Sequence, residues 1–164
     1  MKRIFSQTFG VVGAIIEKDG KIALVQELIN SGKADAGKWN QPAGWIEVGE
    51  DMIEAVEREV EEETGYPFKA KAILGIYSLV RKDIEKELNG TPHAIKIIFT
   101  GEIDADNQKQ LYDDVSDMNW FTPEEIENMN IDELRDLDIK QEVKDYFAGK
   151  SYPLDIIRHT VQKK

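Results

Sequence analysis

The 164-residue chain, of 18.7 kDa, is long enough for one well-buried core and too short for two domains of ordinary size. Its 32 acidic residues outnumber its 21 basic ones, for a formal charge of −11, and no basic run occurs except the terminal Lys163-Lys164 pair, so binding to a nucleic acid polymer is not expected. The absence of cysteine excludes disulfides, thiolate nucleophiles and cysteine-based zinc sites, and it fits a reducing compartment.

The N-terminal stretch MKRIFSQTFGVVGAII imitates a secretory signal, with Lys2 and Arg3 ahead of apolar residues. Polar residues at 6–8 interrupt it, no small-residue cleavage site follows, and it continues into the turn EKDGK, so we interpret it as containing a strand. No segment approaches the roughly 18 apolar residues of a membrane span. We therefore expect a cytoplasmic protein without a membrane partner.

Apolar and β-branched runs predict strands along most of the chain. In order, they are 9–16, 21–28, a short strand through Trp45, Ile46 and Val48, 68–80, 94–103, and a last short strand ending at 119–121. The first two are joined by Asp19-Gly20, a hairpin signal because glycine accepts positive φ. Residues 29–41 and 82–92 contain glycine and polar residues without periodicity, and we expect them to be loops.

Helical periodicity is clearest over 51–64, where an apolar stripe is formed by Met52, Ile53, Val56 and Val60. Asp51 with Glu54 resembles a capping box, and Gly65 followed by Pro67 marks the end. A second helix is expected to start at Thr122, with Pro123 at its first position and Glu125 closing a capping box. A final helix near 138–148, with Val143, Tyr146 and Phe147 as its apolar stripe, is expected to end at Gly149.

Strands lie before and after one central helix, and helices return at the C-terminus. This order predicts an α/β (α+β) fold in which a mixed sheet is covered on both faces. We expect one domain over residues 1–164, since no repeat, low-complexity tract or linker interrupts the chain.

The central helix concentrates negative charge, with five glutamates in seven positions: Glu57, Glu59, Glu61, Glu62 and Glu63. At about 100° per residue, Glu59, Glu62 and Glu63 fall within an arc of roughly 100° beside the apolar stripe, which predicts a cluster at the edge of the core. Like charges at these spacings destabilise a helix unless they are offset. A divalent cation would offset them, since Mg²⁺ prefers oxygen ligands; a solvated acidic face is the alternative.

The flanking residues favour the metal. Residues 44–66, GWIEVGEDMIEAVEREVEEETGY, resemble the 23-residue Nudix box of MutT-type pyrophosphohydrolases. The matching positions are Gly44, Glu50, Arg58, Glu59, Val60, Glu62, Glu63 and Gly65, and the departure is Tyr66, where an aliphatic residue is usual. The neighbouring WNQPAG and WFTPEEI extend the resemblance to about residues 9–127.

The resemblance implies a Nudix-type α/β/α sandwich with a mixed, curved sheet and assigns roles to the box residues. Mg²⁺, with Mn²⁺ as an alternative, would be coordinated by Glu59, Glu62, Glu63 and the backbone of Gly44. Arg58 and Glu50 would form a supporting pair that fixes the loop against the helix; a solvated Arg58 paired with a neighbouring glutamate is the alternative. Many members of the family are dimers, so the resemblance also points to a homodimer.

The implied chemistry is hydrolysis of a diphosphate linkage by metal-activated water. Glu62 is our first choice for the residue that orients or deprotonates this water. In this family the base can instead come from a distal loop, and Asp113, Asp114 and Glu102 are then unranked candidates; each is equally consistent with an acidic residue that faces solvent.

The expected substrate is a small molecule that contains a diphosphate, namely a nucleoside di- or triphosphate or a related nucleoside diphosphate derivative. ADP-ribose and thiamin-type pyrophosphates remain alternatives, although the proline typical of ADP-ribose pyrophosphatases is missing at 80–84. A non-catalytic ligand-sensing module is a further alternative, and a diphosphate isomerase is excluded because it needs cysteine. Trp39, Trp45, Tyr77 and Phe121 are candidates for stacking on a base, and Arg81, Lys82 and His93 for contacting a phosphate; for each aromatic residue, core packing is the alternative.

Overall fold

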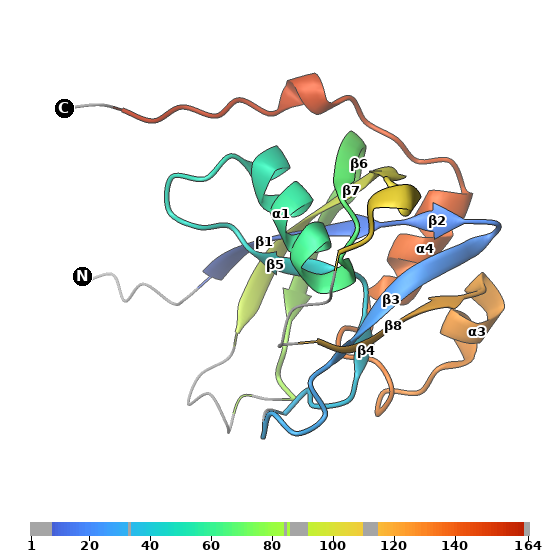
Figure 1. The fold of residues 1–164 in the computed structure, drawn as a ribbon. Coiled ribbons are helices and arrows are strands. Elements are labelled where there is room, and N and C mark those ends of the chain that lie inside the picture. The colour runs from blue at the N-terminus through green and yellow to red at the C-terminus, as the bar shows by residue number, and fades with distance from the viewer. Residues whose placement is uncertain (1–7, 33, 84, 86–91, 110–114, 163–164) are drawn as a thin grey trace, which may run out of the picture.

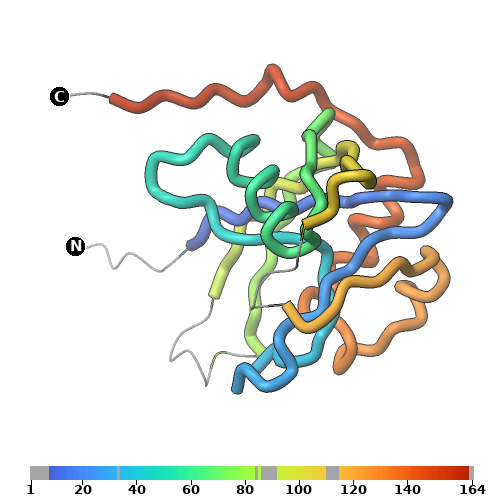
Figure 2. The backbone as a smooth tube through the Cα atoms, viewed as in Figure 1, coloured from blue at the N-terminus to red at the C-terminus, as the bar shows by residue number. Residues whose placement is uncertain are grey.

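The computed structural model describes residues 8–32, 34–83, 85, 92–109 and 115–162, which form two four-stranded sheets and short helices (Figures 1 and 2). None of the helices in these ranges is long and apolar enough to span a membrane. The predicted loop at 82–92 lies largely outside the described residues, and Asp113 and Asp114 lie wholly outside them.

The first sheet is mixed and has the strand order β5-β1-β7-β6. Its strands are β1 (Thr8–Ile15), β5 (Ala43–Trp45), β6 (Phe68–Val80) and β7 (His93–Ile103). β1 pairs in parallel with β7 and antiparallel with β5, and β6 pairs antiparallel with β7.

The second sheet is antiparallel and is built around β3, which pairs with each of the other three strands. Its strands are β2 (Glu17–Lys18), β3 (Lys21–Glu27), β4 (Trp39–Asn40) and β8 (Val115–Phe121). The predicted hairpin is confirmed: Lys18 pairs with Lys21, and the two residues between them, Asp19 and Gly20, both have positive φ (52° and 79°). A turn with two positive φ values matches the twist of the flanking strands.

Helices cover both faces of the first sheet. They are α1 (Met52–Thr64), α3 (Pro123–Asn128) and α4 (Ile139–Phe147), with single turns η1 (Ala105–Asn107) and η2 (Leu154–Ile156). Residues of β1 alternate between two core clusters: Val12 and Ala14 pack with α1, whereas Ile15 packs with α3 and α4. Because successive strand residues point to opposite faces, the sheet lies between helical layers, and the predicted α/β/α arrangement with a mixed sheet is confirmed.

The C-terminal segment, coloured red in Figures 1 and 2, runs extended past α1. Tyr152 exchanges two backbone hydrogen bonds with Ile73 of β6, each 2.8 Å long. Leu154 and Ile157 then pack against the core cluster on the α1 side. The segment therefore covers part of the edge of the first sheet, a contact that its sequence did not predict.

Two strand predictions around the central loop are wrong. The stretch 29–41, expected to be entirely loop, contains β4, and the strand expected through Val48 is instead Ala43–Trp45, with Val48 fully exposed. The pairing of β5 with β1 depends on small side chains, because a Cβ added to Gly13 would stand 3.0 Å from the Cβ of Ala43. Small residues carry little strand propensity of their own, so this strand was not recognisable from composition.

The helix ends lie close to those predicted, and one of the two predicted capping boxes is present. At α1, Asp51 accepts a hydrogen bond from the N–H of Ile53 (2.8 Å), the second helical residue, where a capping box uses the third. Gly65 ends this helix in the left-handed conformation (φ 72°), as expected. The capping box of Thr122 and Glu125 is confirmed at α3. In α4, Val143 is buried, but Phe147 is 49% exposed and does not belong to the buried stripe.

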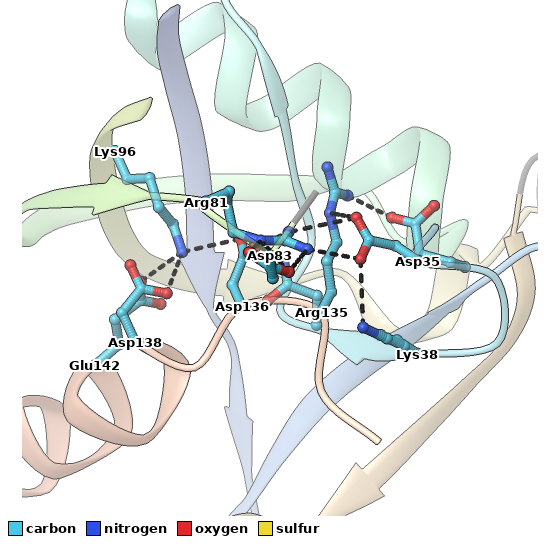
Figure 3. A network of polar contacts seen from close by, with 11 residues as sticks. Asp35, Lys38, Arg81, Asp83, Lys96, Arg135, Asp136, Asp138 and Glu142 are labelled. Atoms are coloured by element: carbon cyan, nitrogen blue, oxygen red, sulfur yellow. Dashed lines mark hydrogen bonds and ion pairs between the residues drawn. The ribbon is translucent and has the colours of Figure 1, made fainter. Parts of the chain in front are cut away.

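A buried ion network joins β7, Arg81 directly after β6, and residues before and within α4 (Figure 3). Lys96 of β7 is 1% exposed, and its ammonium lies 2.8 Å from Asp138, 2.9 Å from Glu142 and 3.4 Å from Asp136. Burial raises the pKa of Glu142 to about 7 against the opposing effect of Lys96. Burial also opposes the charge of Lys96, but the surrounding carboxylates raise the pKa of its ammonium overall.

The network continues through Arg81, whose guanidinium contacts Asp136 (3.0 Å), Asp35 (2.8 Å) and Asp83 (2.7 Å). Trp39 of β4 pairs with the segment before α4: its backbone N–H donates to the carbonyl of Glu133 (2.8 Å), and its carbonyl accepts from the backbone N–H of Arg135 (2.9 Å). These contacts hold residues 133–142 against β7 and against β4, the strand that precedes β5.

We predict that Lys96→Met lowers the free energy of unfolding by about 3–5 kcal/mol, because it leaves buried carboxylates without their counter-ion. Lys71→Met is the matched control: Lys71 is exposed and, among the residues that the structure describes, its ion-pair partner is the exposed Glu102 (3.3 Å), so about 0.5 kcal/mol or less is expected. Urea denaturation monitored by tryptophan fluorescence measures both. Equal losses in the two variants would contradict the structural role of the network.

Candidate functional site

The guanidinium of Arg58 is the centre of the charge cluster on α1. Its Nε and Nη2 donate to the two oxygens of Glu50 (2.7 and 3.0 Å), a two-pronged contact that fits the planar carboxylate. Its Nη1 donates to Glu59 (2.8 Å) and to Glu62 (3.1 Å), and Nη2 also reaches the carbonyl of Trp45 (3.2 Å). One side chain thus ties the loop before α1 to two glutamates of the helix, which is the supporting pair expected from the sequence, extended by two partners.

The charges in this cluster shift the pKa values of its members. The hydrogen bond from Arg58 lowers the pKa of Glu50, and the hydrogen bond to Glu50 raises the pKa of Arg58. Glu50 is further fixed because it accepts from the backbone N–H of Glu47 (3.0 Å). Burial raises the pKa of Glu59 in spite of Arg58, and the negative charges of Glu62 and Glu50 add to this effect. A further positive charge nearby would therefore favour the ionised form of Glu59.

Gly44 lies directly against the Glu59 carboxylate. A Cβ added to Gly44 would overlap the carboxylate carbon and both oxygens of Glu59, so no other residue fits unless the glutamate moves. The backbone of β5 is thus in contact with the end of the Glu59 side chain. The glycine at the start of the box is explained by this approach, which requires the absence of a side chain rather than a special φ.

Glu63 faces a different partner from Glu59 and Glu62. Its Oε2 accepts a hydrogen bond from the backbone N–H of Ala43 (2.9 Å). Burial raises the pKa of Glu63 well above its usual value, although the Ala43 bond and the charge of Arg135 oppose the shift. Arg135 also pairs with Glu27 of β3. The contacts from Ala43, Arg135 and Glu27 were missed by sequence reasoning, because they join segments far apart in the chain and have no local pattern.

The three predicted metal ligands do not converge on one point as they are arranged. Within the described part of the chain, no group of three or more histidine, aspartate or glutamate side chains stands close enough together to hold a metal ion. Glu59 and Glu62 meet at Arg58, whereas Glu63 turns to β5. The donor chemistry nevertheless fits a hard cation, since both carboxylate oxygens of Glu59 lie beside the backbone of Gly44 and burial, with the charges of Glu62 and Glu50, disfavours the ionised form of Glu59.

Glu102, a candidate for the distal base, is exposed and pairs with Lys71 of β6. The structure therefore does not support a place for it among the carboxylates of α1. The other two candidates, Asp113 and Asp114, lie outside the described residues.

Among the candidates for contacting substrate, Trp45 alone is an exposed aromatic residue. Trp39 and Phe121 are partly buried and pack edge to face against the core, with ring centroids 5.0 Å apart, and the Tyr77 hydroxyl donates to Asp145 (2.9 Å). Trp45 is 53% exposed and packs its edge on Phe9, with centroids 4.3 Å apart. Its carbonyl also accepts a hydrogen bond from Arg58, so Trp45, the last residue of β5, is attached to the charge cluster through its backbone.

The candidate phosphate contacts have other partners or lie apart. Arg81 is enclosed by the three aspartates of the buried network. His93 shares a hydrogen bond with the Ser78 hydroxyl (2.8 Å), and Lys82 is exposed. Gln41, in the WNQPAG stretch, is fully buried, and within the described residues neither polar atom of its side chain has a protein partner.

Comparisons with known proteins agree with this geometry. The NUDIX domain model matches residues 7–142. Phosphatase NudJ of Escherichia coli K12 is 31% identical over 147 residues, which cover 89% of this chain and 88% of that protein. A NUDIX hydrolase from Nitrosomonas europaea is 37% identical, with a TM-score of 0.77 and coverage of 94% of this chain and 98% of that one. A MutT protein from Methanosarcina mazei Go1 is 25% identical, with a TM-score of 0.69 and coverage of 90% and 99%.

The family match spans most of the chain, including the box whose arginine, glutamates and leading glycine are in mutual contact. The similarity to the E. coli and N. europaea proteins extends over nearly the full length of both. This chain therefore belongs to the Nudix hydrolase family.

Proposed function

We propose that this Nudix hydrolase is a divalent-metal-dependent pyrophosphohydrolase that uses Mg²⁺ or Mn²⁺. Its substrate is a small molecule with a diphosphate linkage, namely a nucleoside di- or triphosphate or a related nucleoside diphosphate derivative. The observation that carries the proposal is the contact set of Arg58, which brings Glu50, Glu59 and Glu62 to one guanidinium beside Gly44. We also propose that the protein acts in the cytoplasm as a homodimer, by analogy with its family.

The residues that would hold the metal are Glu59, Glu62, Glu63 and the backbone of Gly44. When bound, the metal neutralises phosphate oxygens and lowers the pKa of a coordinated water. The protein then has to position that water, and Glu62 is the proposed residue, since the Glu59 carboxylate is confined by Gly44 and Glu63 is bonded to Ala43. Arg58 and Glu50 act as positioning residues that keep the loop and the helix in register.

Trp45 is the proposed contact for an aromatic group of the substrate, because it is exposed and its backbone is bound to Arg58. Arg81 is not proposed as a phosphate contact, since three carboxylates already surround it. The name of the E. coli relative, Phosphatase NudJ, supports phosphate chemistry without choosing a substrate, and ADP-ribose and thiamin-type pyrophosphates stay in the test. A sensing module is disfavoured because every glutamate of the box is retained.

We predict that release of phosphate or pyrophosphate from one class of these compounds needs Mg²⁺, stops with EDTA, and falls at least about 100-fold in Glu62→Gln, the loss expected when a group that handles the attacking water is removed. The panel contains nucleoside triphosphates, ADP-ribose, dinucleoside polyphosphates and thiamin pyrophosphate. Glu61→Gln is the control, because Glu61 is one residue away and pairs with Lys109. Turnover in EDTA, or an equal loss in both variants, would refute the assigned role, and a folded protein without turnover of any compound would favour a sensing module.

We predict that Gly44→Ala lowers kcat/KM by about 100-fold or more, because its methyl group displaces the Glu59 carboxylate by an ångström or more. The melting temperature should change much less than the activity, since the strain falls on a side chain that can move. Gly10→Ala in β1 is the control: its Cβ meets only the end of Ile46, at 3.3 Å, and activity should be kept. A Gly44→Ala enzyme with unchanged kcat/KM would show that activity does not depend on the observed position of the Glu59 carboxylate.

A further inference from the structure

Nη1 of Arg58 lies between two of the proposed metal ligands. It is 2.8 Å from Oε1 of Glu59, a typical charge-assisted length, and 3.1 Å from Oε2 of Glu62, which is within ordinary hydrogen-bond range. Mg²⁺ binds carboxylate oxygens at about 2.0–2.1 Å. A cation bound to these two oxygens and a guanidinium nitrogen bonded to the same pair would overlap and repel each other, so the two positive groups exclude one another there.

The rest of the Arg58 side chain has independent anchors. Nε and Nη2 are bound by Glu50, which is itself held by the backbone N–H of Glu47, and Nη2 also reaches the carbonyl of Trp45. These anchors lie on the loop side of the guanidinium, away from the atom that faces the helix glutamates. Arg58 can therefore release Glu59 and Glu62 while its contacts with Glu50 are kept.

We propose that Arg58 is an exchangeable counter-ion: its Nη1 neutralises Glu59 and Glu62, and the divalent metal competes with it for these oxygens while Glu50 retains the guanidinium. The proposal rests on the proposed function, since it requires the metal at these glutamates. Removing Arg58 should then have opposite effects on two properties. The substitution should lower the stability of the metal-free protein, because like charges are left facing each other. It should also raise the affinity for the metal, because the competing guanidinium is gone.

Glu50 provides the second arm of the test. Glu50→Gln keeps the size of the side chain but removes the charge that anchors the guanidinium away from the glutamates. Arg58 should then bind Glu59 and Glu62 more strongly, and metal affinity should fall. A purely structural role for the Arg58–Glu50 pair predicts weaker metal binding in both variants, so the sign of the change in Arg58→Met separates the two explanations.

The experiment is titration of the full chain with Mn²⁺, with free Mn²⁺ measured by electron paramagnetic resonance at one pH and ionic strength, together with melting temperatures in EDTA. For Arg58→Met we expect about tenfold tighter Mn²⁺ binding, the equivalent of one lost charge-assisted contact, and a lower melting temperature in EDTA. For Glu50→Gln we expect weaker binding. Lys69→Met is the charge-matched control, since Lys69 is 70% exposed and pairs with Glu57 on the same helix, and its affinity should equal that of the wild type.

Arg58→Lys is included because it keeps the charge and tests the idea if the methionine variant does not fold. A single ammonium cannot bind Glu50 and both helix glutamates at once. The Arg58→Lys variant should therefore bind Mn²⁺ more tightly than the wild type and less tightly than Arg58→Met. If Arg58→Met does not fold, tighter binding by Arg58→Lys than by the wild type is the expected result. Folded Arg58 variants with unchanged or weaker Mn²⁺ affinity would overturn the counter-ion proposal alone. Wild-type protein that binds no Mn²⁺ would overturn the proposed metal dependence and this proposal with it.

Discussion

Five carboxylates within seven residues of one helix repel each other, and the structure around α1 is arranged to offset that repulsion. Each carboxylate has a partner: Glu57 pairs with Lys69 and the N–H of Ala70, Glu59 and Glu62 share Arg58, Glu61 pairs with Lys109, and Glu63 accepts from the N–H of Ala43. Three of these five partnerships involve other segments of the chain. The glutamates of α1 therefore fix the helix against β5 and β6, and they are also a candidate metal site.

The core holds these partners in place. β1 presents Val12 and Ala14 to α1 and Ile15 to the opposite helical layer, so the first sheet is fixed from both sides. The small side chains at Gly13 and Ala43 let β5 approach β1, and the bare backbone at Gly44 then meets Glu59. The buried Lys96 network anchors the segment that pairs with Trp39, shortly before β5. Core packing and the buried ion network thus both fix the position of the backbone from Trp39 to Gly44.

The sequence was informative where local patterns decide the structure. The stripe of α1, the turn at Asp19-Gly20 and the cap at Thr122 depend on residues within a few positions of each other, and all three are present as predicted. The Arg58–Glu50 pair followed from the family resemblance and is present. The wrong predictions concern residues whose partners lie elsewhere in the chain. The position of β5 was predicted wrongly because the strand is stabilised by its pairing with β1. Arg81 was taken for a phosphate contact because its three aspartate partners, 2 to 55 residues away, form no local pattern.

The Lys96 network and the Arg58 cluster on α1 differ in their exposure to solvent, and we infer different roles for them. In the Lys96 network the side chains of Lys96 and Glu142 are buried, so these charges contact other members of the network and not solvent. On α1, the Arg58 and Glu62 side chains are 29% and 37% exposed, which leaves them accessible to a ligand. Burial suits a permanent structural contact, whereas partial exposure suits one that a cation can replace.

The central claim is that the α1 glutamates bind the metal that hydrolysis requires. The most direct test is a crystal structure of the protein with Mn²⁺, in which anomalous scattering locates the metal. Our account predicts Mn²⁺ on the carboxylates of Glu59 and Glu62, with Nη1 of Arg58 withdrawn and Glu50 still bound to the guanidinium. Mn²⁺ bound only at other carboxylates, with Arg58 still on Glu59 and Glu62, would contradict it.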